Sequence, residues 1–182
     1  MPESGLARLF CRWRVRVSFV FLILALIFAQ PTLISLLAGI GLTGLGLCIR
    51  AWACGHLEKE KNLTVTGPYR YTRNPLYFAN LIIGVSVVVA AQSWWVLGFG
   101  FVFFFVFYLV VIYAEKQKME RLFPEKYADY KEKVPLFLPT FRPPLSQKPQ
   151  RFRWSLYHKN REFRAFLGAV AFWLVMAAKM IL

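Results

Sequence analysis

The sequence lacks any charged residue over two long stretches, 17–49 and 76–114. Soluble domains spread their apolar residues at helix or strand periods, so uncharged runs of this length exclude an ordinary soluble fold. A membrane-spanning helix needs about 20 apolar residues to cross a hydrocarbon core of about 30 Å. Another apolar run, 163–182, ends the sequence. The pattern therefore predicts a polytopic membrane protein.

Acidic residues are also scarce, with 9 aspartates and glutamates against 23 lysines and arginines and a net charge of +14. Of the 23 basic residues, 22 lie before residue 17, at 50–73 or at 116–164, and the other is Lys179. The positive-inside rule predicts that these three basic segments are cytoplasmic. Because the charge is divided among them, we expect contact with anionic lipid and no nucleic-acid partner.

Each long run is too long for one span, since a helix of 33 residues would reach about 50 Å. Polar residues or proline interrupt the runs at 30–32 and 92–95. We therefore expect an all-α polytopic membrane protein with five transmembrane helices, arranged as two helical hairpins plus a C-terminal span. The whole chain, 1–182, would form one domain with a cytoplasmic N-terminus and a C-terminus on the opposite side. The expected spans are about 15–30, 32–54, 76–92, 94–114 and 162–182, and the expected cytoplasmic segments are 55–75 and 115–161, the second of them amphipathic.

Cysteine and histidine are rare, with three and two residues respectively, and none has the spacing of metal ligands. The sequence contains no nucleophile elbow and no Walker loop. We therefore expect neither a metal site nor covalent catalysis. Any site must be built from the polar loops or from the adjoining helix ends.

The stretch TGPYRYTRNPLYFAN, 66–80, gathers tyrosine, arginine and proline at the start of the third expected span. Tyr77 and Asn80 are three residues apart and share a helix face, and Arg73 lies just before that helix. One interpretation is an aromatic belt with a snorkelling arginine. The other is a site just inside the membrane boundary, which accounts better for the polar Asn80.

Three further charged residues lie at the ends of expected spans: Arg50, Glu115 and Arg161. The arginines are either positive-inside anchors or members of a site. Glu115 gains a possible role if it faces inward toward Arg73 or Arg50. From Lys116 onward, apolar residues recur at helical spacing among basic ones, which predicts a helix lying on the cytoplasmic face.

Two motifs carry a family resemblance. The first matches a G-x-Y-x-x-x-R-H-P-x-Y signature and the second matches paired glutamates followed by F-G, Y-x-x-Y and V-P. The sequence resembles the integral-membrane methyltransferases that include isoprenylcysteine carboxyl methyltransferase and phosphatidylethanolamine N-methyltransferases. Asn74 replaces the signature histidine and Lys116 the second glutamate. Met119 replaces a leucine that follows the glutamates, and Pro124 replaces the glycine of F-G. The matching residues are Gly67, Tyr69, Arg73, Pro75 and Tyr77, then Glu115, Phe123, Tyr127, Tyr130, Val134 and Pro135.

The resemblance implies a membrane methyltransferase that uses S-adenosylmethionine and a lipid-like or prenylated acceptor, with carboxylate O-methylation favoured over amine N-methylation. It implies that Arg50 or Arg161 orients a carboxylate acceptor. Glu115 would take the proton of an amine acceptor. The implied cofactor-binding residues are Leu63, Val65, Gly67, Tyr69, Arg73, Asn74, Tyr77 and Glu115.

Two other functions remain open at this point. A sterol- or steroid-type membrane reductase would bind NADPH, although the short chain and the methyltransferase motifs count against it. A non-catalytic lipid-binding protein could retain the fold, and Asn74 and Lys116 are the departures that favour it. The expected partners are membrane lipid and a small lipid-like acceptor, and the sequence leaves the oligomeric state open.

Overall fold

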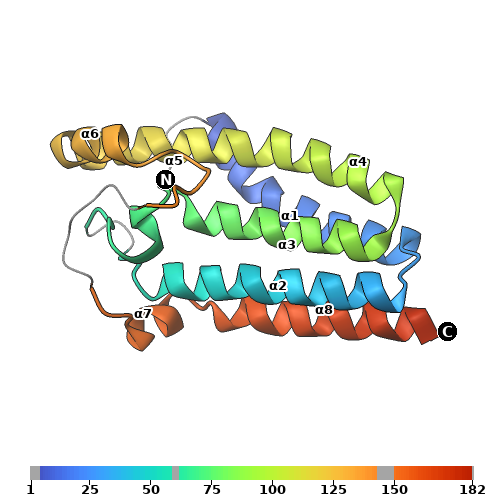
Figure 1. The fold of residues 1–182 in the computed structure, drawn as a ribbon. Coiled ribbons are helices and arrows are strands. Elements are labelled where there is room, and N and C mark those ends of the chain that lie inside the picture. The colour runs from blue at the N-terminus through green and yellow to red at the C-terminus, as the bar shows by residue number, and fades with distance from the viewer. Residues whose placement is uncertain (1–4, 59–61, 143–149, 182) are drawn as a thin grey trace.

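The computed structural model describes residues 5–58, 62–142 and 150–181, which form a bundle of long helices with a polar cap at one end (Figure 1). No strand occurs among these residues, so the all-α prediction is confirmed. The helix α4 continues through a π-helical turn, η2, into α5, and η1 is a short 3-10 helix. The elements are α1 Gly5–Phe28, α2 Leu33–Cys54, η1 Gly67–Arg70, α3 Pro75–Ala91, α4 Trp94–Phe103, η2 Phe104–Tyr108, α5 Leu109–Leu122, α6 Pro124–Lys133, α7 Trp154–Lys159 and α8 Phe163–Ile181.

Three helices are long and apolar enough to cross a membrane: Leu33–Cys54, Trp94–Leu122 and Phe163–Met180. The apolar helices Arg16–Phe28 and Pro75–Ala91 are shorter. The chain is thus a membrane protein by the length and composition of its helices, while five spans and the sidedness of the loops stay predictions. The helix breaks lie where the sequence predicts them, at 29–32 and 92–93.

Small and polar residues hold α2, α3 and α8 together inside the bundle. A Cβ atom on Gly39 would lie 2.5 Å from Cη2 of Trp173, so the glycine lets α8 approach α2 closely. The hydroxyls of Thr43 and Ser86 are 2.6 Å apart, and the indole Nε1 of Trp173 donates to Thr43 Oγ1 at 3.1 Å. Buried hydroxyls need such partners because the apolar interior offers no water.

The end of the bundle near the C-terminus is closed by short turns and caps. Thr32 and Ser35 form a capping box at the start of α2. Lys179 of α8 donates from Nζ to the carbonyl oxygens of Leu26 and Ile27 at 2.6 and 2.7 Å, which caps the last turn of α1. The polar loops all lie at the opposite end, where a site can be built (Figure 1).

At this opposite end, the segment after α6 turns back alongside the start of α3 (Figure 1). We call residues 134–142 the strap. Its backbone accepts from Arg73 N at Pro135 O and donates from Thr140 N to Tyr71 O, each at 3.0 Å. The strap therefore fixes the residues that lead into α3.

Candidate active site

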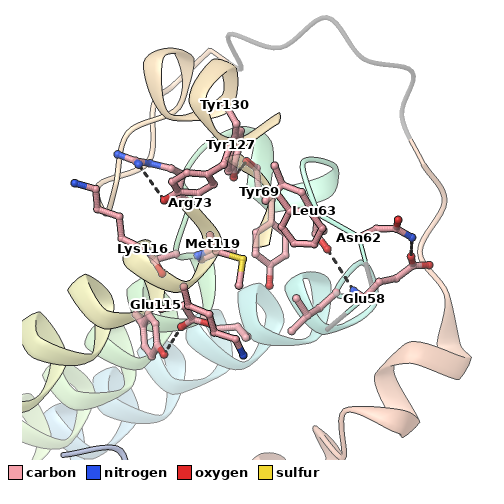
Figure 2. Close-up of a pocket in the computed structure, with 18 of the residues that line it drawn as sticks. Glu58, Asn62, Leu63, Tyr69, Arg73, Glu115, Lys116, Met119, Tyr127 and Tyr130 are labelled. Carbon is pink, nitrogen blue, oxygen red and sulfur yellow. Dashed lines mark hydrogen bonds between the residues drawn. The ribbon is translucent and has the colours of Figure 1, made fainter. Parts of the chain in front are cut away.

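A polar cavity of about 380 Å³ lies at the cap end of the bundle, between the end of α2, the loop before η1, the start of α3, and α5 and α6 (Figure 2). Figure 2 shows tyrosine rings, Met119 and charged side chains grouped around it. The cavity joins the two motifs of the sequence, which lie about 40 residues apart in the chain. Its lining includes Arg50, Glu58, Asn62, Leu63, Tyr69, Arg73, Asn74, Tyr77, Asn80, Glu115, Lys116, Met119, Tyr127 and Tyr130.

Most of the predicted site residues line this cavity: Arg50, Leu63, Tyr69, Arg73, Asn74, Tyr77 and Glu115. Their functional roles stay predictions. Val65, Gly67 and Arg161 do not belong to the lining.

The three predicted residues outside the cavity have other surroundings. Val65 packs against a cluster of Tyr127, Tyr130 and Val134. Gly67 has φ 60°, and a Cβ atom there would lie 2.7 Å from the ring of His56, so both conformation and space require glycine. Arg161 is exposed in the turn between α7 and α8.

Tyr77 and Glu115 meet at the boundary between the cap and the long helices. Pro75 starts α3 at its first position, which puts Tyr77 in the first turn. Its hydroxyl donates to Glu115 Oε2 at 2.6 Å. The ring of Tyr77 also packs edge-on against Tyr108 of η2, with centroids 5.8 Å apart. The carboxylate thus has a fixed direction at the cavity wall.

Arg73 lies among tyrosines and has one buried N–H donor, at Nε, without a hydrogen-bond partner among the described residues. Its Nη1 donates to the hydroxyl of Tyr127 at 3.2 Å, and its guanidinium lies 5.8 Å from the centroid of that ring. A buried donor without a partner costs free energy, so stability alone does not account for this arrangement of Arg73.

Burial keeps the nearby tyrosines neutral. It raises the pKa of Tyr69 well above the ordinary value of 10.0, and it raises the pKa of Tyr127 although Arg73 opposes the shift. It also raises the pKa of Tyr130, whose hydroxyl donates to Tyr69 O at 2.7 Å. All three therefore remain protonated at neutral pH, as hydrogen-bond donors.

Asn74, at the position of the signature histidine, has a structural partner. Its Nδ2 donates to Leu136 O in the strap at 2.8 Å, and its backbone N donates to Thr72 Oγ1 at 3.2 Å. An amide supplies this donor without a titratable ring, so the replacement preserves a connection between α3 and the strap.

Arg50 forms a bidentate ion pair with Glu162, the residue before α8. The distances are 2.5 Å for Nε to Oε1 and 2.9 Å for Nη2 to Oε2. Arg50 Nη1 also donates to Asn80 Oδ1, and the Cys54 thiol lies 3.2 Å from Glu162 Oε2. The pair joins α2, α3 and α8 beside the cavity, and it cancels the charge of Arg50.

Sequence reasoning did not select several residues at this site. Tyr127 and Tyr130 were matched only as motif positions, and Glu58 pairs with Arg153 at the opposite side of the cavity. The sequence analysis names Arg161 as a candidate, whereas its neighbour Glu162 is the residue that pairs with Arg50. The sequence does contain a signal for Glu162. It is an isolated acidic residue directly before the apolar run 163–182, at the same predicted membrane boundary as Arg50.

A second cavity of about 340 Å³ lies between α1, α3, α4 and η2, and its wall is almost wholly apolar. Asn80 lines both cavities, so the polar and the apolar space each reach this residue. The lining of the apolar cavity includes Phe21, Leu22, Leu81, Gly84, Val88, Gly100, Phe104 and Tyr108.

Within the described part of the chain, no three His, Cys, Asp or Glu side chains lie close enough together to hold a metal ion. The chain is similar to two curated proteins, each 32% identical to it. One is the cobalt-zinc-cadmium resistance protein CzcN of Cupriavidus metallidurans, matched over 136 residues, and the other is the nickel-cobalt-cadmium resistance protein NccN of Alcaligenes xylosoxydans xylosoxydans, matched over 134 residues. Each match covers 70% of this chain and 62% of the relative.

No solved structure matches the chain. A family profile described as phospholipid methyltransferase matches residues 34–126, which is half of the chain and includes the motif around Arg73 and the carboxylate Glu115. The predicted family resemblance is confirmed: the chain belongs to the isoprenylcysteine and phospholipid methyltransferase family.

Proposed function

We propose that the protein is an S-adenosylmethionine-dependent methyltransferase of the membrane that acts on a lipid-like or prenylated acceptor. The observation that carries the proposal is that one residue, Asn80, lines both a polar and an apolar cavity. A soluble cofactor suits the polar cavity, which opens at the cap end. An acceptor with an apolar chain suits the other cavity, which lies among the long helices.

The residues of the polar cavity fit the cofactor. The guanidinium of Arg73, which lines the cavity, suits the carboxylate of its methionine part, since charge-assisted hydrogen bonds to a carboxylate are strong. Met119 and the tyrosine rings offer apolar faces for the adenine. When bound, S-adenosylmethionine supplies an electrophilic methyl group on a positively charged sulfur.

The acceptor's reactive group would lie near Asn80, where hydrogen-bond donors converge. Asn80 Oδ1 is occupied by Arg50, which leaves the Nδ2 hydrogens for a ligand. Arg50 has five N–H donors, three of which bind Glu162 and Asn80, so two are left. These donors favour a carboxylate acceptor. Such an acceptor needs no general base, and the chain's task is to orient it and keep water away.

An amine acceptor is the second candidate, and both the family description and Glu115 favour it. An amine must lose a proton on methylation, and the Glu115 carboxylate at the cavity wall is placed to take it. Glu115→Gln separates the two cases. It should abolish methylation of phosphatidylethanolamine vesicles but leave most of the methylation of N-acetyl-S-farnesylcysteine, a prenylated carboxylate.

The proposal includes a cytoplasmic location for the polar cavity, because the basic residues are concentrated at the cap end. The names of the two relatives refer to metal resistance, and this chain spans 62% of their length. A membrane reductase or a non-catalytic lipid-binding protein would differ in the cofactor bound. The reductase would bind a nicotinamide dinucleotide, and the non-catalytic protein would bind no cofactor.

Calorimetric titration of S-adenosylhomocysteine into the detergent-purified protein tests the proposal. Arg73→Ala removes a charged donor, so the dissociation constant should rise about tenfold or more. Tyr77→Phe should weaken binding less, because it removes only the hydroxyl. Arg164→Ala, an exposed arginine outside the cavity, should bind like the wild type. A folded wild-type protein that binds no S-adenosylhomocysteine would overturn the proposal.

The apolar cavity is tested separately by filling it. Gly84 lines this cavity, and a Cβ atom there has no neighbour within 4 Å, so Gly84→Phe places a ring in the open space. Methyl transfer to N-acetyl-S-farnesylcysteine should be lost while S-adenosylhomocysteine binding is kept. Gly41→Phe is the matched control, because Gly41 is exposed and equally free of neighbours. Equal activity of the two variants would place the acceptor elsewhere.

A further inference from the structure

The strap carries two large apolar side chains that the described protein leaves mostly or wholly exposed. Leu138 is 66% exposed and Phe141 is 102% exposed, the latter a ring with no protein contact to shield it. Phe137, the residue before Leu138, packs against the bundle. The centroid of its ring is 6.1 Å from that of Phe78 and 5.7 Å from that of Phe104. The strap thus has one face against the bundle and one face directed away from it.

The inward face fixes the depth of the strap along the bundle. Phe78 lies in the first turn of α3, and Phe104 begins η2 within a helix long and apolar enough to span the membrane. Phe137 is therefore level with the first turn of an apolar helix. The backbone N–H of Thr140 donates to Tyr71 O, four residues before α3 begins. The strap therefore runs from the first turn of α3 back toward the cap between Phe137 and Thr140. Leu138 and Phe141 consequently lie at the level where the apolar helices end.

The surroundings of this outward face are those of a lipid boundary. In η2, next to Phe104, the side chains of Phe105 and Val106 are 47% and 44% exposed on the apolar surface of the bundle. The strap lies beside that surface, because Phe137 packs against Phe104. The exposed Arg142 follows Phe141 directly, an order of aromatic then basic side chain that suits lipid headgroups.

We propose that the strap is a membrane-interface anchor, with Leu138 and Phe141 inserted among lipid headgroups and upper acyl chains beside α3. Insertion removes two large apolar side chains from water, which is favourable. The same strap accepts hydrogen bonds from Thr72, Arg73 and Asn74 through its carbonyl oxygens. Lipid contact on one face therefore stabilises the residues that line the polar cavity on the other.

Fluorescence quenching tests the position of the strap. A Phe141→Cys variant is labelled with an environment-sensitive dye and placed in phosphatidylcholine nanodiscs with or without brominated acyl chains. Cys11 and Cys48 are replaced by alanine, while the buried Cys54 is kept. Lys126→Cys on the exposed side of α6 is the matched control. Strong quenching at 141 with little at 126 is expected. Equal, weak quenching at both would overturn the proposal and indicate water or a protein partner at this face.

A second measurement tests the connection to the cavity. The double variant Leu138→Ser, Phe141→Ser removes the apolar anchors but none of the strap's hydrogen bonds. In nanodiscs, we expect it to bind S-adenosylhomocysteine several-fold more weakly than wild type, and Lys126→Ser to show no change. Unchanged affinity in the double variant would overturn the connection. This second measurement rests on the proposed function, whereas the quenching does not, so a failure of cofactor binding in the wild type leaves the anchor independently testable.

Discussion

Replacing Glu162 by alanine should destabilise the protein strongly, because it leaves Arg50 without its carboxylate. The pair is bidentate, with distances of 2.5 and 2.9 Å, and the side chain of Glu162 is only 6% exposed. Removing one partner of a buried ion pair costs about 3–5 kcal/mol. The side chain of Arg50 is 19% exposed and borders the polar cavity, where water can partly replace the carboxylate. We therefore expect a loss at or below the lower limit of that range, about 2–3 kcal/mol.

A double-mutant cycle isolates the pair from other effects of these changes. Arg50→Met alone should cost a similar amount, since Glu162 is then left buried and charged. The double variant Arg50→Met, Glu162→Ala removes both charges and should cost clearly less than the sum of the single changes. Glu162→Gln keeps the shape of the side chain and should cost less than Glu162→Ala.

Unfolding by sodium dodecyl sulfate in mixed micelles, followed by circular dichroism, measures each free-energy difference. The decisive quantity is the difference between the double variant and the sum of the two singles. If the costs of Arg50→Met and Glu162→Ala simply add, the two groups do not stabilise each other and the reasoning is refuted.

Three further changes test other parts of the fold. Gly39→Ala puts a methyl group 2.5 Å from Trp173 and should cost about 1–3 kcal/mol by overpacking, measured by the same unfolding assay. Its control, Gly41→Ala, meets no neighbour within 4 Å and should not destabilise, so equal costs would contradict the close approach of α8. Lys179→Met removes the cap from the last turn of α1 and should lower the free energy of unfolding by about 0.3–2 kcal/mol. Proteolytic cleavage just after α1, beyond residue 28, should become faster, and an unchanged rate would speak against the cap. Because burial raises the pKa of Tyr130 above 10.0 in the folded protein, the stability it provides is complete below pH 10 and falls as pH rises beyond that value. Stability measured against pH should fall less steeply in Tyr130→Phe, and identical slopes would refute the shift.

The sequence allowed the helical class and the helix breaks to be predicted, because these depend on local properties. Uncharged runs and interrupting residues such as Pro31 and Gln92 act within a few positions, and the structure has turns at both places. The motifs also predicted that Arg73, Tyr77 and Glu115 gather at one membrane boundary, and all three line one cavity.

The partners of Arg50 could not be predicted in the same way. Glu162 lies 112 residues away, and its pairing depends on how α8 packs against α2. The turn before α8 gives Arg161 a positive φ of 55° and leaves its side chain exposed, while the next residue is buried. Adjacent residues therefore have opposite environments, and the lone acid in the sequence does not by itself identify Arg50 as its partner. The strap's return to α3 is likewise a long-range effect, fixed by hydrogen bonds to 71–74.

The π-helical turn η2 sets the angular phase between the two halves of one long helix. Each residue of an α-helix advances the helix by about 100°, and a π turn holds one residue more than an α turn. If Phe104–Tyr108 were wound as an ordinary α-helix with no residue removed, everything after it would be rotated by about that angle. Glu115 would then turn away from Tyr77 although neither residue had changed. The π-helical winding of these five residues is therefore as much a determinant of the site as the identity of its side chains.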